Sequence, residues 1–204
     1  MPGLLTKLAK AKRLPLSFLG SLGVKDCPGG ISIEYRLQDG SLAPRQRIRN
    51  GLSSKDGFKW TGNGEIVPYG LWKLAKNGSK LAQDARNGAQ AVFNGPCKPR
   101  PNLAKNSPIL DHASLLVEGE SDTWILWYHG YPALGLPGSS TSKILEIRYF
   151  SGIKTLYIWQ EPDQGGQLFA SGIAKRLFEI GFLGKAKVLR LDGFKDPSEI
   201  HIKR

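Results

Sequence analysis

The second half of the chain alternates short apolar runs with segments of helical length, and this rhythm constrains the fold more than any other feature. The strand-like runs are Ser114 to Val117, Pro132 to Leu136, Thr155 to Trp159 and Val188 to Leu191. The helix-like segments between them are Asp122 to His129, Ser139 to Phe150 and Gln167 to Phe182. This alternation predicts an α/β fold with a compact, mostly parallel four-stranded sheet and helices on both faces.

Acidic residues follow three of the four predicted strands. They are Glu118, Glu120 and Asp122 after the first strand, Glu161 and Asp163 after the third, and Asp196 after the fourth. The carboxyl ends of parallel strands share one edge of the sheet, where ligands bind in open α/β folds. Carboxylates gathered there raise one another's pKa, so the cluster is favourable mainly when a divalent cation neutralises it. Oxygen ligands without clustered cysteine or histidine predict Mg²⁺ or Mn²⁺, and these ions imply phosphate chemistry.

The formal net charge of +12 belongs entirely to the first half of the chain. Residues 1–110 carry 18 Lys and Arg against 6 Asp and Glu, whereas residues 111–204 carry 11 of each kind. A basic half joined to a neutral half with acidic signatures predicts that one part binds a polyanion while the other holds metal. The alternative is a basic surface that only keeps the protein in solution.

The basic half contains a predicted β-hairpin with arginines on one face. Its strands are Ile31 to Arg36 and Leu42 to Arg49, and its turn is at Asp39 and Gly40. Arg45, Arg47 and Arg49 recur with period two, and three arginines on one strand face cannot all be core residues. We therefore expect that face to be hydrated or bound to an anion.

A proline-rich stretch marks a domain boundary, because four prolines lie within residues 96–108. We expect a smaller basic α+β subdomain over residues 1–108 and the α/β domain over residues 109–204. The basic subdomain also contains the aromatic segment Phe58-Lys59-Trp60 and a predicted helix from Leu71 to Ala91.

The composition predicts a cytoplasmic protein that does not cross a membrane, since no apolar stretch approaches the roughly 18 residues of a span. Leucines at helical spacing, Leu4, Leu5 and Leu8, predict a short amphipathic helix near the start, and a second one follows around Leu19. The two cysteines, Cys27 and Cys97, belong to no CxxC pattern, so we expect free thiols and no zinc site.

At the acidic residues the sequence resembles the TOPRIM domain of bacterial-type primases, topoisomerases and some nucleases. Val117-Glu118-Gly119 with Asp122 is followed by an acid-x-Asp-x-Gly-Gly turn, and Lys195-Asp196-Pro197-Ser198-Glu199 resembles the segment that closes this domain in primases. The hairpin, Phe58-Lys59-Trp60 and Pro68-Tyr69-Gly70-Leu71 follow the layout of the basic subdomain of bacterial and phage primases. The family's usual Asp-x-Asp pair is Glu161-Pro162-Asp163 here, and a glutamate can still ligate Mg²⁺.

The resemblance implies a role for each matching residue. Glu118 and Asp163 would be catalytic, and the metal ligands would be Glu118, Glu161, Asp163, Asp122 and Asp196. Nucleotide and DNA binding would fall to Arg45, Arg47, Arg49, Lys59 and Trp60. Trp60 and Tyr69 can stack on bases, although both are equally compatible with the core.

The resemblance also implies an activity: Mg²⁺-dependent synthesis of RNA primers on single-stranded DNA, from ribonucleoside triphosphates, by a phage or mobile-element protein. A replicative helicase would act in cis or in trans. Two alternatives stay open, a TOPRIM nuclease and a DNA-binding module without catalysis. A topoisomerase would need a further domain to supply its nucleophilic tyrosine.

Overall fold

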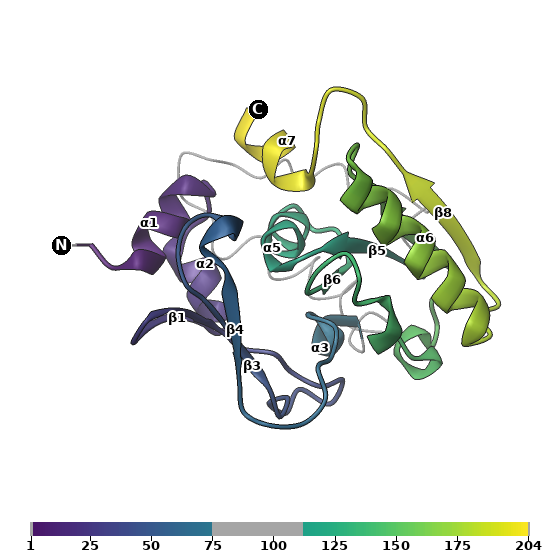
Figure 1. Ribbon diagram of the computed structural model, residues 1–204, viewed down its shortest axis with the longest axis horizontal. Coiled ribbons are helices and arrows are strands. Elements are labelled where there is room, and N and C mark those ends of the chain that lie inside the picture. Colours follow the sequence, from purple (N-terminus) through teal and green to yellow (C-terminus); the bar gives the residue numbers. More distant parts are fainter. Residues whose placement is uncertain (1, 75–111, 204) are drawn as a thin grey trace.

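The computed structural model describes residues 2–74 and 112–203. These residues form two four-stranded sheets with flanking helices (Figure 1). The first sheet is antiparallel, with strand order β1-β2-β3-β4. The second is parallel, with order β6-β5-β7-β8. The predicted α/β class, with a four-stranded parallel sheet preceded by a smaller α+β part, is confirmed.

The antiparallel sheet lies against two short helices. Its strands are β1 (Val24–Cys27), β2 (Gly30–Ile33), β3 (Gln46–Arg49) and β4 (Phe58–Thr61), and the helices are α1 (Leu4–Ala11) and α2 (Leu16–Ser21). Leu5, Leu8 and Leu19 of the helices are buried in the same apolar cluster as Ile31 and Ile33 of β2. The helices expected from the leucine spacing are therefore present, and that spacing supplies their buried face.

The parallel sheet has helices on both faces. Its strands are β5 (Ala113–Glu118), β6 (Ala133–Leu136), β7 (Thr155–Trp159) and β8 (Lys185–Leu189), and its helices are α5 (Glu120–Tyr128), α6 (Gln164–Glu179) and α7 (Pro197–Lys203) (Figure 1). Phe169 of α6 clusters with Ile158 of β7. On the other face, Val117 and Trp159 cluster with Ile200 of α7. Successive residues of a strand point to opposite faces, which explains why Ile158 and Trp159 join different clusters.

The helix predicted from Ser139 to Phe150 is wrong. Two 3-10 turns occupy this segment instead, Ser142–Ile144 and Ile147–Phe150. Leu145 between them has extended backbone (ψ 133°), and its side chain is fully buried. Burial of Leu145 in the core is thus achieved by an extended residue, which interrupts any continuous helix.

Other predicted bounds move by a few residues; the first hairpin strand, predicted from Ile31 to Arg36, is β2 and ends at Ile33. The second hairpin strand is confined to β3, because the side-chain amide of Gln46 bonds the backbone N and O of Tyr35 and replaces the regular ladder. The fourth strand of the parallel sheet begins at Lys185 rather than Val188, in register with Thr155 of β7. Helix α6 begins at Gln164, since Asp163 caps it.

Two predictions fall outside the described residues. The proline-rich boundary lies there, so the division into residues 1–108 and 109–204 stays a prediction. Of the helix expected from Leu71 to Ala91, α3 (Leu71–Leu74) is the described portion. Across residues 2–74 and 112–203, no helix is long and apolar enough to pass through a membrane.

The two sheets are joined through Tyr69. Its backbone N–H donates to the Gly135 carbonyl (2.8 Å), and the Gly135 N–H donates in return (3.0 Å). The Tyr69 hydroxyl accepts from Nε1 of Trp124 on α5 (2.9 Å), and the whole side chain is buried. Of its two predicted roles, Tyr69 therefore takes that of a core residue, and it fixes the antiparallel sheet beside α5.

Candidate metal site and nucleic-acid interface

Three carboxylates from separate elements converge at the carboxyl edge of the parallel sheet. Asp122 lies in the first turn of α5, Glu161 follows β7, and Asp196 immediately precedes α7. One oxygen of each lies within 4.8 Å of the others; Asp122 is buried, and the other two are partly exposed. Of the five predicted metal ligands, the structure brings these three together.

Two glycines permit the backbone conformation and the close packing found at this edge of the sheet. Gly119, between β5 and α5, has φ +83°, a conformation that side chains with a Cβ rarely adopt. Gly166, at the start of α6, packs directly on the backbone of Glu161, and a Cβ there would lie 2.6 Å from the Glu161 nitrogen. The Gly-Gly turn noted in the sequence is therefore required by close contact between α6 and the residue that carries a candidate ligand.

Asp122 is held in place by hydrogen bonds from helix α7. Its Oδ1 accepts hydrogen bonds from the backbone N–H (3.0 Å) and the hydroxyl (2.7 Å) of Ser198 in α7. Burial raises the pKa of Asp122 to about 7, and the neighbouring charge of Asp196 acts in the same direction. A buried carboxyl beside a second carboxylate favours a bound cation, because the cation would offset both effects.

Asp196 is likewise oriented from within the chain. Its Oδ1 accepts from the backbone N–H of Glu199 (2.7 Å). Among residues 2–74 and 112–203, Asp122 and Asp196 each accept their hydrogen bonds at Oδ1. A set of hard carboxylate oxygens, with no cysteine or histidine among the three, fits Mg²⁺ or Mn²⁺.

Lys195 lies between the two acids of the Glu161-Pro162-Asp163 turn. Its Nζ is 3.1 Å from Oε2 of Glu161 and 3.5 Å from Oδ2 of Asp163. Asp163 also accepts from the backbone N–H of Gly166 (2.9 Å), and this bond and Lys195 hold its pKa below the usual range. Asp163 is therefore an α6 cap as well as a partner of Lys195.

Glu118 ends β5 and, like Asp163, is not one of the three convergent acids, although its charge contributes to raising the pKa of Glu161. Burial raises the pKa of Glu118 itself, and the charge of Asp163 contributes in the same direction. The backbone N–H of Ser139 and the cations of Lys195 and Arg47 act in the opposite direction. The catalytic roles assigned to Glu118 and Asp163 stay predictions.

The arginine face of β3 turns toward the start of α5. Nη1 of Arg47 lies 2.7 Å from Oε1 of Glu120, and both side chains are almost fully buried. Cζ of Arg47 is 3.9 Å from the ring centroid of Phe58, which is a cation–π contact. The anion expected on this strand face is thus a carboxylate of the chain itself.

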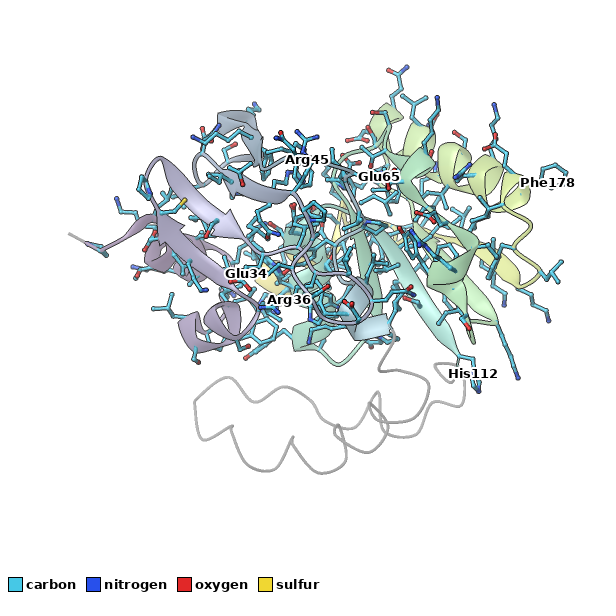
Figure 2. The ribbon with its side chains drawn as sticks, turned by 90° about the horizontal axis from the view of Figure 1, so that it is seen from below. Glu34, Arg36, Arg45, Glu65, His112 and Phe178 are labelled. Carbon is cyan, nitrogen blue, oxygen red and sulfur yellow. The ribbon has the colours of Figure 1, made fainter. Side chains whose placement is uncertain are left out.

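The remaining predicted binding residues divide between the two faces of the antiparallel sheet. Arg49 is buried and donates to the carbonyls of Gly51 and Leu52. Arg45 is partly exposed and lies at the junction of the two halves (Figure 2). Trp60 pairs with Arg47 across the sheet, whereas the exposed Lys59 pairs with Ile48 and so lies on the opposite face. Their roles in nucleotide and DNA binding stay predictions.

Sequence reasoning missed four residues that organise the site: Tyr35, Glu120, Lys195 and Ser198. Glu120 was grouped with the acids after the first strand without a role of its own, and its side chain is 3% exposed. The period-two arginines predicted a strand face that is hydrated or bound to an anion, and a carboxylate of the chain supplies the anion at Arg47. No sequence pattern identified which acid it was.

The parallel sheet with carboxylates on its carboxyl edge, joined to a basic antiparallel sheet, has the same fold as primase catalytic cores. The primase fragment of the bacteriophage T7 primase-helicase protein matches with TM-score 0.61 and 19% identity, over 95% of this chain and 68% of that structure. The E. coli primase catalytic core matches with TM-score 0.63 and 13% identity, over 97% of this chain and 68% of that structure.

A third structure, a DnaG primase catalytic domain bound to ssDNA, matches with TM-score 0.58 and 14% identity, over 98% of this chain and 67% of that domain. The chain therefore spans about two thirds of each of these three structures. No protein-family model matches the chain, and no curated protein matches it significantly. The resemblance read from the acidic motifs is confirmed at the level of the fold.

Proposed function

We propose that this protein is a primase catalytic core, which synthesises short RNA primers on a single-stranded DNA template. The observation that carries the proposal is the convergence of Asp122, Glu161 and Asp196 at one sheet edge, within a fold shared with primase cores. The proposal includes cytoplasmic action, a phage or mobile-element origin and a replicative helicase in cis or in trans. Similarity to part of a phage primase-helicase supports these last two.

The acidic edge would hold Mg²⁺ or Mn²⁺ through Asp122, Glu161 and Asp196. When bound, the cation would neutralise the triphosphate and stabilise the charge that develops during phosphoryl transfer. Ser198 fixes the orientation of Asp122, and the Glu199 N–H fixes that of Asp196. Lys195 holds the Glu161 and Asp163 carboxylates toward each other, which restrains the altered acidic turn.

Glu118 would accept the proton of the primer's 3′ hydroxyl as a general base. Its pKa is raised above that of a free glutamate, so its carboxylate is a stronger base than an exposed one. Arg45, at the junction of the two sheets, would contact the phosphates of the template or of the nucleotide.

One assay tests the proposal and separates it from its rivals. The protein is incubated with single-stranded template, Mg²⁺ and labelled ribonucleoside triphosphates, and the products are resolved by length. Short RNA supports a primase, whereas degraded template supports a TOPRIM nuclease. Binding of DNA with neither product supports a module without catalysis.

The matched variants are Glu118→Gln and Glu65→Gln. The first removes the proposed base, and the second removes an exposed glutamate at the junction of the halves (Figure 2). We expect Glu118→Gln to lose RNA synthesis while it retains DNA binding, and Glu65→Gln to retain both. Unchanged synthesis in Glu118→Gln would exclude the role assigned to that residue.

A further inference from the structure

One carboxylate, Glu120, joins the two halves of the molecule through buried contacts. Its Oε1 accepts from the hydroxyl of Tyr35 and from Nη1 of Arg47. Tyr35 follows β2 and Arg47 lies in β3, while Glu120 opens α5. A single acid therefore connects two segments of the antiparallel sheet to the first turn of α5.

The cluster around this acid is closed by aromatic rings. Trp60 packs edge-on against Tyr35, with ring centroids 5.0 Å apart, and Phe58 stacks on Arg47. Tyr35 is fully buried, and Nε of Arg47 is buried without a hydrogen-bond partner among the described residues. The arginine thus depends on Glu120 for charge compensation, since removal of one partner of a buried pair leaves an uncompensated charge.

The position of Glu120 connects this cluster to the acidic edge. It lies two residues after Glu118 and two before Asp122. Asp122 is bound to Ser198 of α7, so the first turn of α5 is held by the antiparallel sheet on one side and by α7 on the other. Arg47 is also close enough to Glu118 to lower its pKa.

We propose that Glu120 is a positioning residue, which sets the distance between the basic sheet and the acidic edge through Arg47 and Tyr35. A nucleic acid held on the basic sheet would then meet Glu118 in a fixed geometry. The activity readout of this inference rests on the proposed function, but its distance readout does not.

The test measures the separation of the two halves directly. Spin labels are attached at Thr61→Cys on β4 and Phe178→Cys on α6, in a background with Cys27→Ser and Cys97→Ser. Both labelled positions are exposed, and Phe178 points away from the body of the molecule (Figure 2). We expect Glu120→Gln to widen the distance distribution, and the milder Tyr35→Phe, which removes one hydrogen bond, to widen it less.

Glu34→Gln is the matched control. Glu34 pairs with Lys25 (2.8 Å) and with Arg36 (2.6 Å), and all three residues belong to the antiparallel half (Figure 2). Loss of these two ion pairs should leave the distance distribution unchanged. If Glu120→Gln does not fold, Tyr35→Phe decides, because it retains the ion pair.

Kinetics separate positioning from stability. In the folded variants we expect kcat for RNA synthesis to fall by about tenfold or more with KM for the nucleotide little changed, since small misplacements at a reacting centre have large effects on rate. An unchanged distance distribution, or an unchanged kcat per folded molecule, overturns the inference. If the wild type makes no RNA, the proposed function fails, and the distance distribution alone decides the role of Glu120.

Discussion

Ser198 is the residue that orients the most buried carboxylate of the site. It donates twice to Oδ1 of Asp122, and groups that orient metal ligands commonly affect metal affinity by 10- to 100-fold. We predict that Ser198→Ala, which removes the hydroxyl bond, weakens Mn²⁺ binding by about tenfold, as measured by calorimetry. Ser171→Ala is the control, because the Ser171 hydroxyl donates to the carbonyls of Gln167 and Leu168 within α6. Equal affinities in the two variants would contradict the prediction.

Lys195 is expected to weaken cation binding, in contrast to Ser198, because its own charge already neutralises part of the acidic edge. It pairs with Glu161 and Asp163 and is about half exposed. We predict that Lys195→Met strengthens Mn²⁺ binding several-fold at low ionic strength, since a competing charge is removed. Lys175→Met on α6, whose partner Glu179 lies 4.0 Å away, should leave the affinity unchanged. Weaker binding in Lys195→Met would show that the lysine assists the site.

At the residue scale, the sequence predicted the three acids that meet at the sheet edge, but not the residues that hydrogen-bond to them. Asp122, Glu161 and Asp196 were predicted because strand ends of a parallel sheet share one edge, a rule that needs no side-chain detail. The bond from Ser198 to Asp122 joins residues 76 positions apart, and it depends on how α7 packs on α5. Long-range contacts of this kind leave no local pattern.

Leu145 anchors the segment between strands β6 and β7 in the core. It is fully buried between two 3-10 turns. We predict that Leu145→Ala lowers the free energy of unfolding by about 2–5 kcal/mol, the usual effect of removing a buried leucine. Ile147→Ala, at a position 48% exposed, should change it by about 0.5 kcal/mol or less. Urea unfolding measures both, and similar losses would contradict the prediction.

Two histidines connect helices α5 and α7 to the turn that follows α1. Nε2 of His201 on α7 lies 3.2 Å from the Arg13 carbonyl and must donate to it, so Nδ1 accepts from Nε2 of His129 on α5 (2.9 Å). Burial, and then the charge of His201, lowers the pKa of His129. A base with a lowered pKa in the fold stabilises the fold above its ordinary pKa, and this stabilisation is lost as the pH falls.

We therefore predict that the free energy of unfolding decreases between pH 7.5 and 5.5. In His129→Gln, which retains a side-chain donor without titrating, the decrease should be smaller. His112→Gln is the control, because His112 is exposed (Figure 2) and its Nδ1 lies 3.0 Å from the Gly152 carbonyl, in the loop before β7. Identical pH profiles for the wild type and His129→Gln would exclude this role.

Element types were predictable wherever one periodicity covered a whole element. Phe169, Ile173 and Leu177 recur at helical spacing along α6, and all three are buried. The prediction failed for residues 139–150, where capping residues at the start and apolar residues after them imitate a helix. Leu145 enters the core in extended backbone because of how the surrounding elements pack, and the local sequence does not reveal this.

Charge is divided across the whole molecule, and this division predicts the salt dependence of DNA binding. Residues 1–110 carry the excess of 12 positive charges, although Arg47 and Arg49 are internally compensated or buried. The association constant for single-stranded DNA should fall with salt, with a slope of about 0.7 per phosphate contacted.

Arg45→Ala is expected to reduce this slope by about 0.7, because Arg45 is partly exposed at the junction of the halves. Lys154→Ala, at the amino end of β7 and so at the opposite edge of the sheet, should leave it unchanged. Fluorescence anisotropy at several salt concentrations measures both slopes. A slope unaffected by Arg45→Ala would place the DNA elsewhere on the basic half.

The acidic cluster is assembled from widely spaced parts of the chain: residues 122, 161 and 196 supply carboxylates, and residue 198 orients the first of them. During synthesis on the ribosome, the sheet and α6 can form before residue 198 has emerged. A nascent chain therefore carries its basic half long before its candidate metal site is complete. On the proposed function, it could bind nucleic acid at that stage but not yet polymerise.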